Sequence, residues 1–509
     1  MRITILVFFI FFNFLTLFSQ SYFSKSYDLF NHQWEETRNI GFVNNSIYIS
    51  GLKNNINDAY QIVSKFDLYG NMLFSKKHSS SYPCFDAIFE KEYFYFGGTK
   101  FPEYKKWVIY KTNAEGDSIL QKEYEIPGER WDYHSVFRFE DIGNQYIMGR
   151  NVIDLQDSIY YNGKWRLKSK ALLAWINKDL SLDTFTIIEP ELYYTNIFDL
   201  KVDADSNLLV SYVFAKLFNN NGNLYDEGIL AINIYSKNKK LISHREINKT
   251  YDSGGILNIQ KDKSYIYAYS TPTPDTFVAS VSKYDSIGNK LWEYRFPTNY
   301  EKVFYFEALE TTTDGGIVGC GSIGKNLVDS IESTGFIFKI DTNGNKLWDR
   351  IIAVRGKNLD YPKYAAYLAG RFSDIKELPN GDLIIGGNLR NNYFDTIKNK
   401  LDHQDDIWLV KTDRDGCLEP NCGSLQQITP VKELLTPDEN IINIYPNPTN
   451  SVIYLSDFYE SFTLIDVNGK FVKTGIYAPE IDLSQIDNGT YFLHLKLKNH
   501  FIHYKIIKL

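Results

Sequence analysis

Short runs that alternate between apolar and polar residues recur along most of this chain, separated by clusters of Asp, Asn and Gly. The clearest copy spans residues 304–352, where the turns TDGG and TNGN and one polar loop join the runs FEALETT, GIVGCGS, GFIFKID and KLWDRII. Alternating runs of this length predict β-strands, and the turn residues between them indicate consecutive hairpins. Four antiparallel strands joined in this way form one blade of a β-propeller.

The second strand of this block recurs seven times, at intervals of about 50 to 65 residues. Each copy is followed by a third strand and a turn, but only six are followed by a good fourth strand. After the last third strand comes CLEPNCG, which is typical of a turn. The seven second strands lie at 45–51, 92–98, 144–150, 206–212, 263–269, 314–320 and 380–387.

The missing fourth strand is available near the start of the chain, as YFSKSYDLF at residues 22–30. An open ring leaves two exposed sheet edges, and pairing of the chain ends removes both. We therefore predict an all-β chain in which a seven-bladed β-propeller spans residues 20–424 and is closed by the N-terminal strand. Six or eight blades stay open as alternatives, because the Asp-x-x-Gly turn has decayed in the third and fourth copies.

Two further features of the repeats bear on function. The hairpin pattern K-[IFY]-D-x-x-G-[ND]-x-x-W, complete at 283–292 and 339–348, resembles that of exported bacterial β-propeller repeat proteins. Long polar inserts separate the second and third strands at 151–170, 216–227 and 388–406. Loops on one rim of a rigid ring commonly carry binding residues, although tolerated surface insertion explains these inserts as well.

Composition and charge indicate an exported chain that does not bind nucleic acid. Aromatic residues make up 16% of the chain, with 38 Tyr and 35 Phe, which favours strands. The net charge of −7 is spread without a basic stripe, which argues against nucleic-acid binding. Met1 and Arg2 precede an apolar core of about 16 residues, which predicts a secretory leader over residues 1–19. No later apolar run is long enough to predict a transmembrane helix.

The four cysteines are consistent with an oxidising compartment. Cys417 and Cys422 lie close together in GCLEPNCG, so a small disulfide-closed loop is expected there. Cys320 lies inside a predicted strand, where a small buried hydrophobic residue is the simpler interpretation. The pairing of Cys84 and Cys320 stays open.

The pattern changes after a polar, proline-bearing linker at residues 425–440. Residues 441–509 contain six or seven short strands with hairpin turns, which predicts a small C-terminal β-sandwich. It contains four motifs, which are Tyr445-Pro446-Asn447-Pro448-Thr449, Asp466-Val467-Asn468-Gly469-Lys470, Asn488-Gly489-Thr490-Tyr491 and, as the last five residues of the sequence, Lys505-Ile506-Ile507-Lys508-Leu509.

Together, and in this order, these motifs resemble the type A C-terminal sorting domain of the type IX secretion system. The resemblance covers residues 441–509 and implies a Bacteroidetes protein that engages the type IX machinery, crosses the outer membrane and loses its tail. Release, or attachment to surface lipopolysaccharide, is then expected. The residues that carry the sorting signal are Tyr445, Pro446, Asn447, Pro448, Asn468, Gly469, Gly489, Tyr491, Lys505 and Lys508.

The sequence carries no His-Glu-x-x-His, Cys-x-x-Cys or Gly-x-Ser-x-Gly motif, and no phosphate-cradling glycine loop appears after a predicted strand. We therefore assign no catalytic, cofactor-binding or metal-binding residue and expect no cofactor. The repeated positions of Trp292 and Trp348 favour blade packing over ligand binding. Aromatic rings stack on sugars, and the candidate ligand platform consists of aromatic residues in less regular stretches, namely Trp131, Tyr133, Tyr160 and Tyr161.

These observations favour a secreted or cell-surface propeller that acts as a non-enzymatic binding module for a glycan or protein ligand. The alternative is a surface hydrolase or lyase that acts on glycans or peptides through carboxylates in the central channel. Asp and Glu are abundant in the sequence, so no single pair stands out.

Overall fold

The computed structural model describes residues 22–29, 34–55, 58–100, 106–125, 130–131, 138–161, 164–188, 194–220, 223–250, 255–272, 277–297, 302–327, 330–354, 369–395, 400–428, 431–434, 444–445, 448–455, 459–467, 469–478, 480–496 and 501–509. The chain divides into two compact units, Met1–Leu435 and Thr436–Leu509. The predicted leader at residues 1–19 lies outside the described residues. In the described part, no helix is long and apolar enough to cross a membrane.

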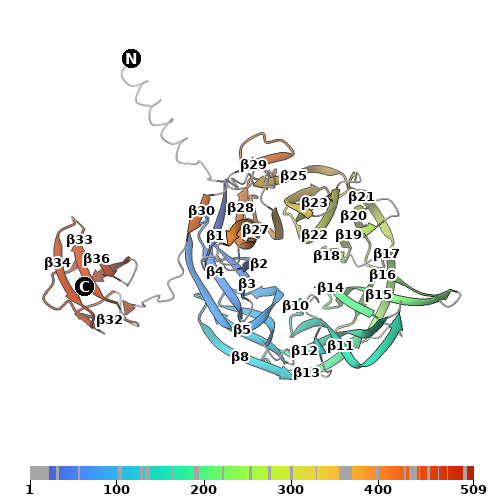
Figure 1. Ribbon diagram of the computed structural model, residues 1–509, viewed down its shortest axis with the longest axis horizontal. Helices are drawn as coiled ribbons and strands as arrows, with labels where there is room; N and C mark the ends of the chain where they lie inside the picture. The colour runs from blue at the N-terminus through green and yellow to red at the C-terminus, as the bar shows by residue number, and fades with distance from the viewer. Residues whose placement is uncertain are drawn as a thin grey trace, which may run out of the picture. The chain divides into compact units, whose positions relative to one another are not determined.

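The described strands of the first unit form seven four-stranded antiparallel blades around a common axis, with the first strand of each blade innermost (Figure 1). The 18-residue strand β5 is shared, because its first half pairs with β4 and its second half with β6. Blade 1 contains β2 (Trp34–Val43), β3 (Ser46–Asn55), β4 (Asp58–Phe66) and the first half of β5 (Met72–Phe89). Blade 2 contains the second half of β5, then β6 (Tyr93–Lys100), β7 (Lys106–Asn113) and β8 (Ser118–Glu125). Blade 3 contains β10 (Arg138–Asp141), β11 (Gln145–Tyr161), β12 (Lys164–Asn177) and β13 (Leu182–Ile188), with β9 (Arg130–Trp131) beside β11.

Blades 4 to 7 follow the same order of strands. Blade 4 contains β14 (Tyr194–Val202), β15 (Leu208–Asn220), β16 (Asn223–Tyr235) and β17 (Leu241–Thr250), and blade 5 contains β18 (Gly255–Ile259), β19 (Tyr265–Pro272), β20 (Phe277–Tyr284) and β21 (Lys290–Arg295). Blade 6 contains β22 (Lys302–Thr311), β23 (Ile317–Leu327), β24 (Ser330–Ile340) and β25 (Lys346–Val354). Blade 7 contains β26 (Ala369–Glu377), β27 (Leu383–Asp395), β28 (Lys400–Thr412) and β1 (Phe23–Asp28).

The ring is closed by the N-terminal strand, which confirms the prediction for residues 22–30. Strand β1 pairs antiparallel with β28, placing Tyr27 opposite Ile407. The indole N–H of Trp408 donates to Ser24 Oγ at 2.9 Å, and Tyr27 is fully buried. The last blade therefore takes its outermost strand from the start of the chain, as the count of fourth strands required.

The three long inserts continue the blade hairpins, whereas the sequence suggested polar loops. Strands β11 and β12 stay paired out to Tyr161 opposite Lys164, and β15 and β16 out to Asn220 opposite Asn223. Strands β27 and β28 pair to the same extent, with Asp395 opposite Lys400. A polar sequence therefore does not exclude paired strands, and periodicity alone did not separate these long hairpins from loops.

The turn that follows the third strand has the same geometry in all seven blades of the described ring. Its fourth residue adopts a left-handed conformation, including Leu180 (φ 63°) and Lys239 (φ 66°) in the two decayed copies. Glycine suits this position for two reasons. It adopts the left-handed conformation without strain, and at Gly344 a Cβ would lie 2.7 Å from the ring of Trp292 in the preceding blade. The seven residues are Gly70, Gly116, Leu180, Lys239, Gly288, Gly344 and Gly416.

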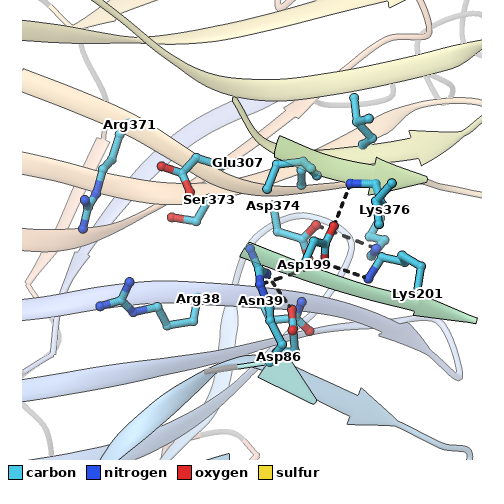
Figure 2. A pocket seen from close by; sticks show the side chains of 15 residues that line it. Arg38, Asn39, Asp86, Asp199, Lys201, Glu307, Arg371, Ser373, Asp374 and Lys376 are labelled. Atoms are coloured by element: carbon cyan, nitrogen blue, oxygen red, sulfur yellow. Dashed lines mark hydrogen bonds and ion pairs between the residues drawn. The ribbon is translucent and has the colours of Figure 1, made fainter. Parts of the chain in front are cut away.

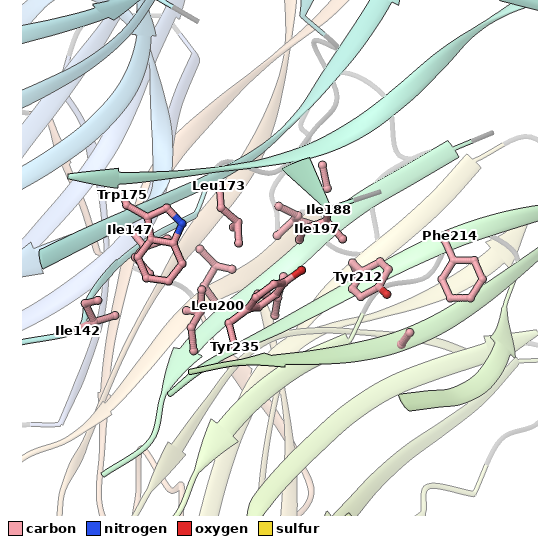
Figure 3. Close-up of a cluster of buried hydrophobic side chains, with 14 of the residues drawn as sticks. Ile142, Ile147, Leu173, Trp175, Ile188, Ile197, Leu200, Tyr212, Phe214 and Tyr235 are labelled. Atoms are coloured by element: carbon pink, nitrogen blue, oxygen red, sulfur yellow. The ribbon is translucent and has the colours of Figure 1, made fainter. Parts of the chain in front are cut away.

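Most of the core lies between neighbouring blades. Figure 3 shows one such cluster, in which Trp175 and Ile147 of blade 3 face Leu200 and Tyr235 of blade 4. The tryptophans of the third strands, at 107, 175 and 408, are all fully buried. Because each blade buries its faces against two neighbours, closure of the ring completes the core.

Two short strands lie in the segment that the sequence analysis treated as a linker. Strand β29 (Leu425–Ile428) pairs parallel with β25, and β30 (Val431–Leu434) pairs parallel with β1. A disulfide joins Cys417 to Cys422 just before β29. We call residues 417–434 the closing segment, because it covers the outer edges of blades 6 and 7.

The second unit consists of two small sheets that share one core, as predicted for a β-sandwich. The sheets have the orders β31-β32-β35 and β34-β33-β36-β37. Leu464, Leu493 and Ile506 are fully buried between them. The strands are β31 (Ile444–Tyr445), β32 (Val452–Leu455), β33 (Ser461–Asp466), β34 (Phe471–Ile476), β35 (Glu480–Asp482), β36 (Gly489–Lys496) and β37 (Phe501–Lys508).

Candidate functional site

The innermost strands of all seven blades line a cavity on the axis of the ring, here called the axial cavity. Its volume is about 110 Å³. Five cationic and four anionic side chains face it, together with Asn39 and Ser373 (Figure 2). The charged residues are Arg38, Arg138, Lys201, Arg371, Lys376, Asp86, Asp199, Glu307 and Asp374.

β-Bulges turn several of these side chains toward the axis. The pairing register of β2, β14, β22 and β26 shifts by one residue at Arg38, Phe198, Glu307 and Ser373, respectively. A bulge inserts one extra residue and redirects its neighbours, so two consecutive residues can face the same side. Arg38 with Asn39 in β2, and Ser373 with Asp374 in β26, line the cavity in this way.

Three of the four carboxylates join neighbouring blades. Asp374 of blade 7 accepts the backbone N–H of Ile40 in blade 1 at 2.8 Å. Asp199 of blade 4 accepts the N–H of Leu257 in blade 5, also at 2.8 Å, and Asp86 of blade 2 accepts from Phe139 in blade 3 at 3.2 Å. These carboxylates therefore satisfy backbone N–H groups in the innermost strand of the next blade.

The same carboxylates also face basic groups. Arg138 donates to Asp86 at 3.1 Å, and Lys201 Nζ lies 3.5 Å from Asp199 and 3.3 Å from Glu140. Burial lowers the pKa of Lys201, but the carboxylates of Asp199, Glu140 and Asp86 together outweigh it and the net shift is upward. Burial raises the pKa of Glu140 to about 7, and Lys201 offsets this only in part.

Lys376 stands in the same relation to blade 7. Its Nζ lies 3.2 Å from Glu310 and 3.7 Å from Asp374. Burial again lowers the pKa of the lysine, and Asp374 and Glu310 reverse the direction of the shift. Both lysines are consequently held as cations between two carboxylates each.

Arg38, Arg371 and Glu307 line the remaining side of the cavity, and the carboxylate of Glu36 pairs with both arginines. Glu36 forms ion pairs with Arg38 and, at 3.3 Å, with Arg371. No hydrogen bond or ion pair joins Glu307 to another described residue. Burial raises the pKa of Glu307, although Arg371, Arg138 and Arg38 act in the opposite direction.

The axial cavity is continuous with a wider mouth at the ends of the first strands. This mouth has a volume of about 610 Å³ and shares Asn39, Asp86, Lys201 and Lys376 with the cavity. Its wall is partly apolar, through Phe42, Val43, Ile88, Phe89 and Ile259, and partly charged, through Glu310 and Glu377. A volume of this size is in the range of sites that bind small organic ligands.

Sequence reasoning did not find these axial residues. They come from seven separate strands, and a charged residue within an otherwise apolar first strand is only a weak signal of a bulge. Within the part of the chain that the structure describes, no group of three or more His, Cys, Asp or Glu could hold a metal ion.

The predicted aromatic platform is not among the residues brought together at the axis. Tyr133 lies outside the described residues, as do the side chains of Trp131, Tyr160 and Tyr161. Strand β9 places the backbone of Trp131 opposite Val152, and Tyr160 and Tyr161 lie at the end of the extended hairpin of β11 and β12. The platform stays a prediction.

In the second unit, three of the four C-terminal motifs meet at one place. Thr449 donates its N–H to Ile507 O at 2.9 Å and accepts the N–H of Leu509 at 2.8 Å. Lys508, largely buried, donates to the Asn488 side chain at 3.3 Å. The C-terminal end of β37 is therefore held by residues about 20 and 60 positions earlier in the chain.

The other predicted signal residues are placed as follows. Gly469 takes a φ of 79° in the hairpin between β33 and β34, and Tyr491 donates to Asp487 O at 2.6 Å. Lys505 and Pro448 are exposed. Tyr445 belongs to β31, and Gly489 begins β36. Pro446, Asn447 and Asn468 lie outside the described residues.

Residues 443–509 match the family model described as a secretion system C-terminal sorting domain. The second unit is a type IX secretion sorting domain. Its presence implies engagement with the type IX machinery and delivery outside the cell or to its surface. The match confirms the resemblance carried by the four motifs and says nothing about the first unit.

Solved structures similar to the chain are propellers and enzymes of low identity. The β-propeller domain of the Trilobed protease from Pyrococcus furiosus is 9% identical, with 73% of this chain and 95% of that chain covered and a TM-score of 0.37. The polysaccharide lyase Uly1 is 8% identical, with coverages of 74% and 90% and a TM-score of 0.42.

A prolyl endopeptidase is likewise 8% identical, with 92% of this chain covered and a TM-score of 0.41. The chain spans about half the length of that enzyme, 54%. None of these likenesses bears on the activity of the first unit. No curated protein matches the chain.

Proposed function

We propose that this protein is an exported, non-enzymatic binding module that holds its ligand at the axial cavity and mouth of the propeller. The observation that carries the proposal is the engagement of the axial carboxylates. Asp86, Asp199 and Asp374 each accept a backbone N–H of the neighbouring blade and each face a basic group.

A glycoside hydrolase of the usual kind needs two carboxyl groups that are available to the substrate. Carboxylates that hold adjacent blades together cannot move toward a substrate without opening the ring. Among the described acids that line the axial cavity itself, Glu307 is the one that is left for such a role. A site with cations, hydrogen-bond donors and an adjoining apolar mouth is better suited to binding.

The test is a binding and turnover screen on the chain from residue 20 onward, with both units present. A panel of polysaccharides and surface proteins is presented, and both retained ligand and released product are measured. Binding without turnover supports the proposal. Turnover of any panel member that is lost in Glu307→Gln would overturn it.

The second candidate, a surface hydrolase or lyase, rests on Glu307 itself. Burial raises the pKa of Glu307, which favours the protonated form that a general acid requires. On this hypothesis Glu307→Gln abolishes turnover but keeps ligand affinity. Equal turnover in the variant and the parent excludes the hypothesis.

For export, we propose that residues 1–19 are removed as a leader, that the sorting domain is cleaved after translocation, and that the product is released or bound to lipopolysaccharide. The motif cluster at Thr449 and Lys508 supports a role for the extreme C-terminus. Deletion of Lys505–Leu509 should leave the protein in the periplasm, measured by fractionation. The matched control is Lys496→Ala, which changes an exposed side chain at the end of β36 and should be exported normally. Normal surface delivery of the deletion would contradict the assignment.

A further inference from the structure

The same group of three charged side chains occurs twice where the axial cavity opens into the mouth. In each group, an aspartate and a lysine lie two residues apart in the innermost strand of one blade, and the lysine is the last residue but one of that strand. The corresponding residue of the preceding blade is a glutamate. The first group consists of Asp199 and Lys201 in β14 with Glu140 in β10, and the second of Asp374 and Lys376 in β26 with Glu310 in β22.

The members of each group follow the same order from the cavity to the mouth. The aspartates line the axial cavity but not the mouth, the lysines line both spaces, and the glutamates line the mouth but not the cavity. The side chains of Asp199 and Asp374 are only 2% and 5% exposed. Those of Glu140 and Glu310 are 27% and 32% exposed. The glutamates are therefore the carboxyl groups of these two sets that a ligand in the mouth can contact.

From this arrangement we infer that the mouth binds its ligand through an organic cation, a primary ammonium or a guanidinium group, at the carboxyl groups of Glu140 and Glu310. The inference rests on the proposed binding function and names the chemistry of the group that is recognised. Both cations donate charge-assisted N–H bonds to carboxylate oxygens, which are the stronger class of hydrogen bond.

The lysines compensate the two glutamates only in part, because each lysine also serves a buried aspartate. Lys201 lies 3.3 Å from Glu140 and 3.5 Å from Asp199. The second lysine divides its charge in the same way, at 3.2 and 3.7 Å. Burial raises the pKa of Glu140, the carboxylates of Asp86 and Asp199 act in the same direction, and Lys201 does not cancel the shift. The raised pKa is the sign of a negative charge that lacks a full partner.

The other carboxyl groups of the mouth do not reverse this balance. Asp86 and Asp141 pair with one cation each, at 3.1 and 2.7 Å. Glu377 accepts the N–H of Thr313 at 2.6 Å and its O–H at 3.3 Å, and it forms no ion pair with another described residue. The carboxyl groups that line the mouth or share its lysines are those of Asp86, Glu140, Asp141, Asp199, Glu310, Asp374 and Glu377, and the cations that pair with them are Arg138, Lys178, Lys201 and Lys376. Carboxyl groups therefore outnumber cations around the mouth in the described part of the chain.

The guanidinium groups on the other side of the axial cavity do not offset this surplus. Arg38 and Arg371 face two carboxyl groups of their own, those of Glu36 and Glu307. Positive and negative groups are equal in number on that side, so the negative surplus belongs to the mouth.

The rest of the mouth suits the carbon skeleton of an organic cation. Phe42 and Val43 of blade 1 and Ile88 and Phe89 of blade 2 are half-buried and form an apolar wall. Aromatic rings attract cations as well as apolar groups. The volume of about 610 Å³ lies in the range of sites for small organic ligands. A hydrated inorganic cation would use the carboxyl groups but not this wall.

The experiment measures the thermal midpoint of the chain from residue 20 onward at pH 8, above the pKa of about 7 of Glu140, so that this carboxyl group is charged. Sodium chloride is replaced stepwise by butylammonium or butylguanidinium chloride at constant ionic strength, and 1-butanol is the neutral counterpart. A saturable rise of the midpoint with at least one of the two cations, and none with 1-butanol, is expected. The absence of a saturable rise with both cations, or an equal rise with 1-butanol, would overturn the inference.

A further pair of probes distinguishes the two sources of such a cation once butylammonium or butylguanidinium has bound. N-acetyl-lysinamide carries the ammonium group of a peptide, and N-acetyl-norleucinamide has the same length without the charge. Tighter binding of N-acetyl-lysinamide than of butylammonium assigns the cation to a side chain of a protein ligand. The reverse order assigns it to a small organic amine.

Variants of the two glutamates make the result specific. Glu140→Gln and Glu310→Gln keep the shape of each side chain, and each should raise the dissociation constant of the effective cation at least tenfold. Each constant is taken from the rise above the variant's own ligand-free midpoint, so a change in stability does not obscure it. The control is Glu123→Gln on β8, because Glu123 is also 27% exposed and pairs with a lysine, Lys100, at 2.6 Å. The control should leave the constant unchanged, and an unchanged constant in both mouth variants would contradict the inference.

Failure of this inference and failure of the proposed function are distinguishable. A ligand from the screen that binds without competition from either butyl cation, and equally well to Glu140→Gln and Glu310→Gln, overturns the cation site and leaves the binding function standing. Cation binding that is weakened in both variants, together with turnover of a substrate, keeps the cation site and overturns the non-enzymatic function.

Discussion

The carboxylate of Asp374 should be one of the most sensitive single positions for the stability of the ring. Its two oxygens accept the N–H groups of Ile375 and Ile40, each at 2.8 Å, and the second bond crosses from blade 7 to blade 1. Asp374→Ala leaves both buried N–H groups without their acceptor, which costs about 1–3 kcal/mol for each. Burial raises the pKa of Asp374, so relief of the buried charge offsets part of this loss. We expect a net decrease of about 3 kcal/mol in the free energy of unfolding.

Asp199→Ala provides the matched variant at an interior junction of the ring. Asp199 bonds Leu200 in its own blade at 2.9 Å and Leu257 in the next blade at 2.8 Å, so the lost hydrogen bonds are equivalent. Urea unfolding followed by intrinsic fluorescence gives the two free energies. Hydrogen exchange at Ile40 and at Leu257 reports the junction that opens locally.

The control is Asp341→Ala, which removes an exposed turn carboxylate that accepts from Asn343 and Asn345. Its effect should be clearly smaller than that of Asp374→Ala. Equal losses of unfolding free energy in Asp341→Ala and Asp374→Ala would refute the reasoning. A loss of under about 0.5 kcal/mol in Asp374→Ala would refute it as well. Either result would mean that water in the axial cavity replaces the lost acceptor at no cost.

Three further outcomes follow from local geometry. Reduction of the Cys417–Cys422 disulfide, which closes a loop with a sequence separation of five, should lower stability by about 2 kcal/mol in urea unfolding with and without reductant. The pKa of Glu140 is raised to about 7 in the folded protein, so the folded state favours its protonated form. The free energy of unfolding should therefore fall by up to about 3 kcal/mol as the pH rises from the pKa of Glu140 in the unfolded chain to about 7. Glu140→Gln should remove this dependence on pH. Ser206 is half-buried and has a left-handed φ of 62°. Ser206→Gly should therefore raise the free energy of unfolding by about 1 kcal/mol, measured as a higher thermal midpoint.

The seven blades and their closure were predictable because each strand carries its own pattern and each turn its own residues. The third and fourth copies show the limit of this reasoning. Leu180 and Lys239 occupy the left-handed position without glycine, and the fold tolerates them because packing of the flanking strands fixes the turn. The strands β29 and β30 were missed since each has only four residues and pairs with a distant partner.

The axial site was beyond the reach of sequence for a different reason. Arg38 and Arg371 are separated by more than 300 residues, and neither belongs to a motif. Their proximity depends on two bulges and on closure of the ring, which are properties of the whole fold. The sorting motifs, by contrast, were recognisable because they are short, ordered and located at the chain end. Short local motifs therefore predict the export of the protein, whereas the axial cavity is formed by packing between residues far apart in the sequence.

The division of the chain into two units explains how one protein can carry both. Among the described residues, Leu464, Leu493 and Ile506 belong to a hydrophobic cluster formed by the sorting domain itself. The closing segment ends at β30, before the boundary at residues 435 and 436. Loss of the tail beyond this boundary would remove no strand from a blade and no residue from the axial cavity. Export can therefore end in proteolysis while the ring, its covered edges and its charged axis stay intact.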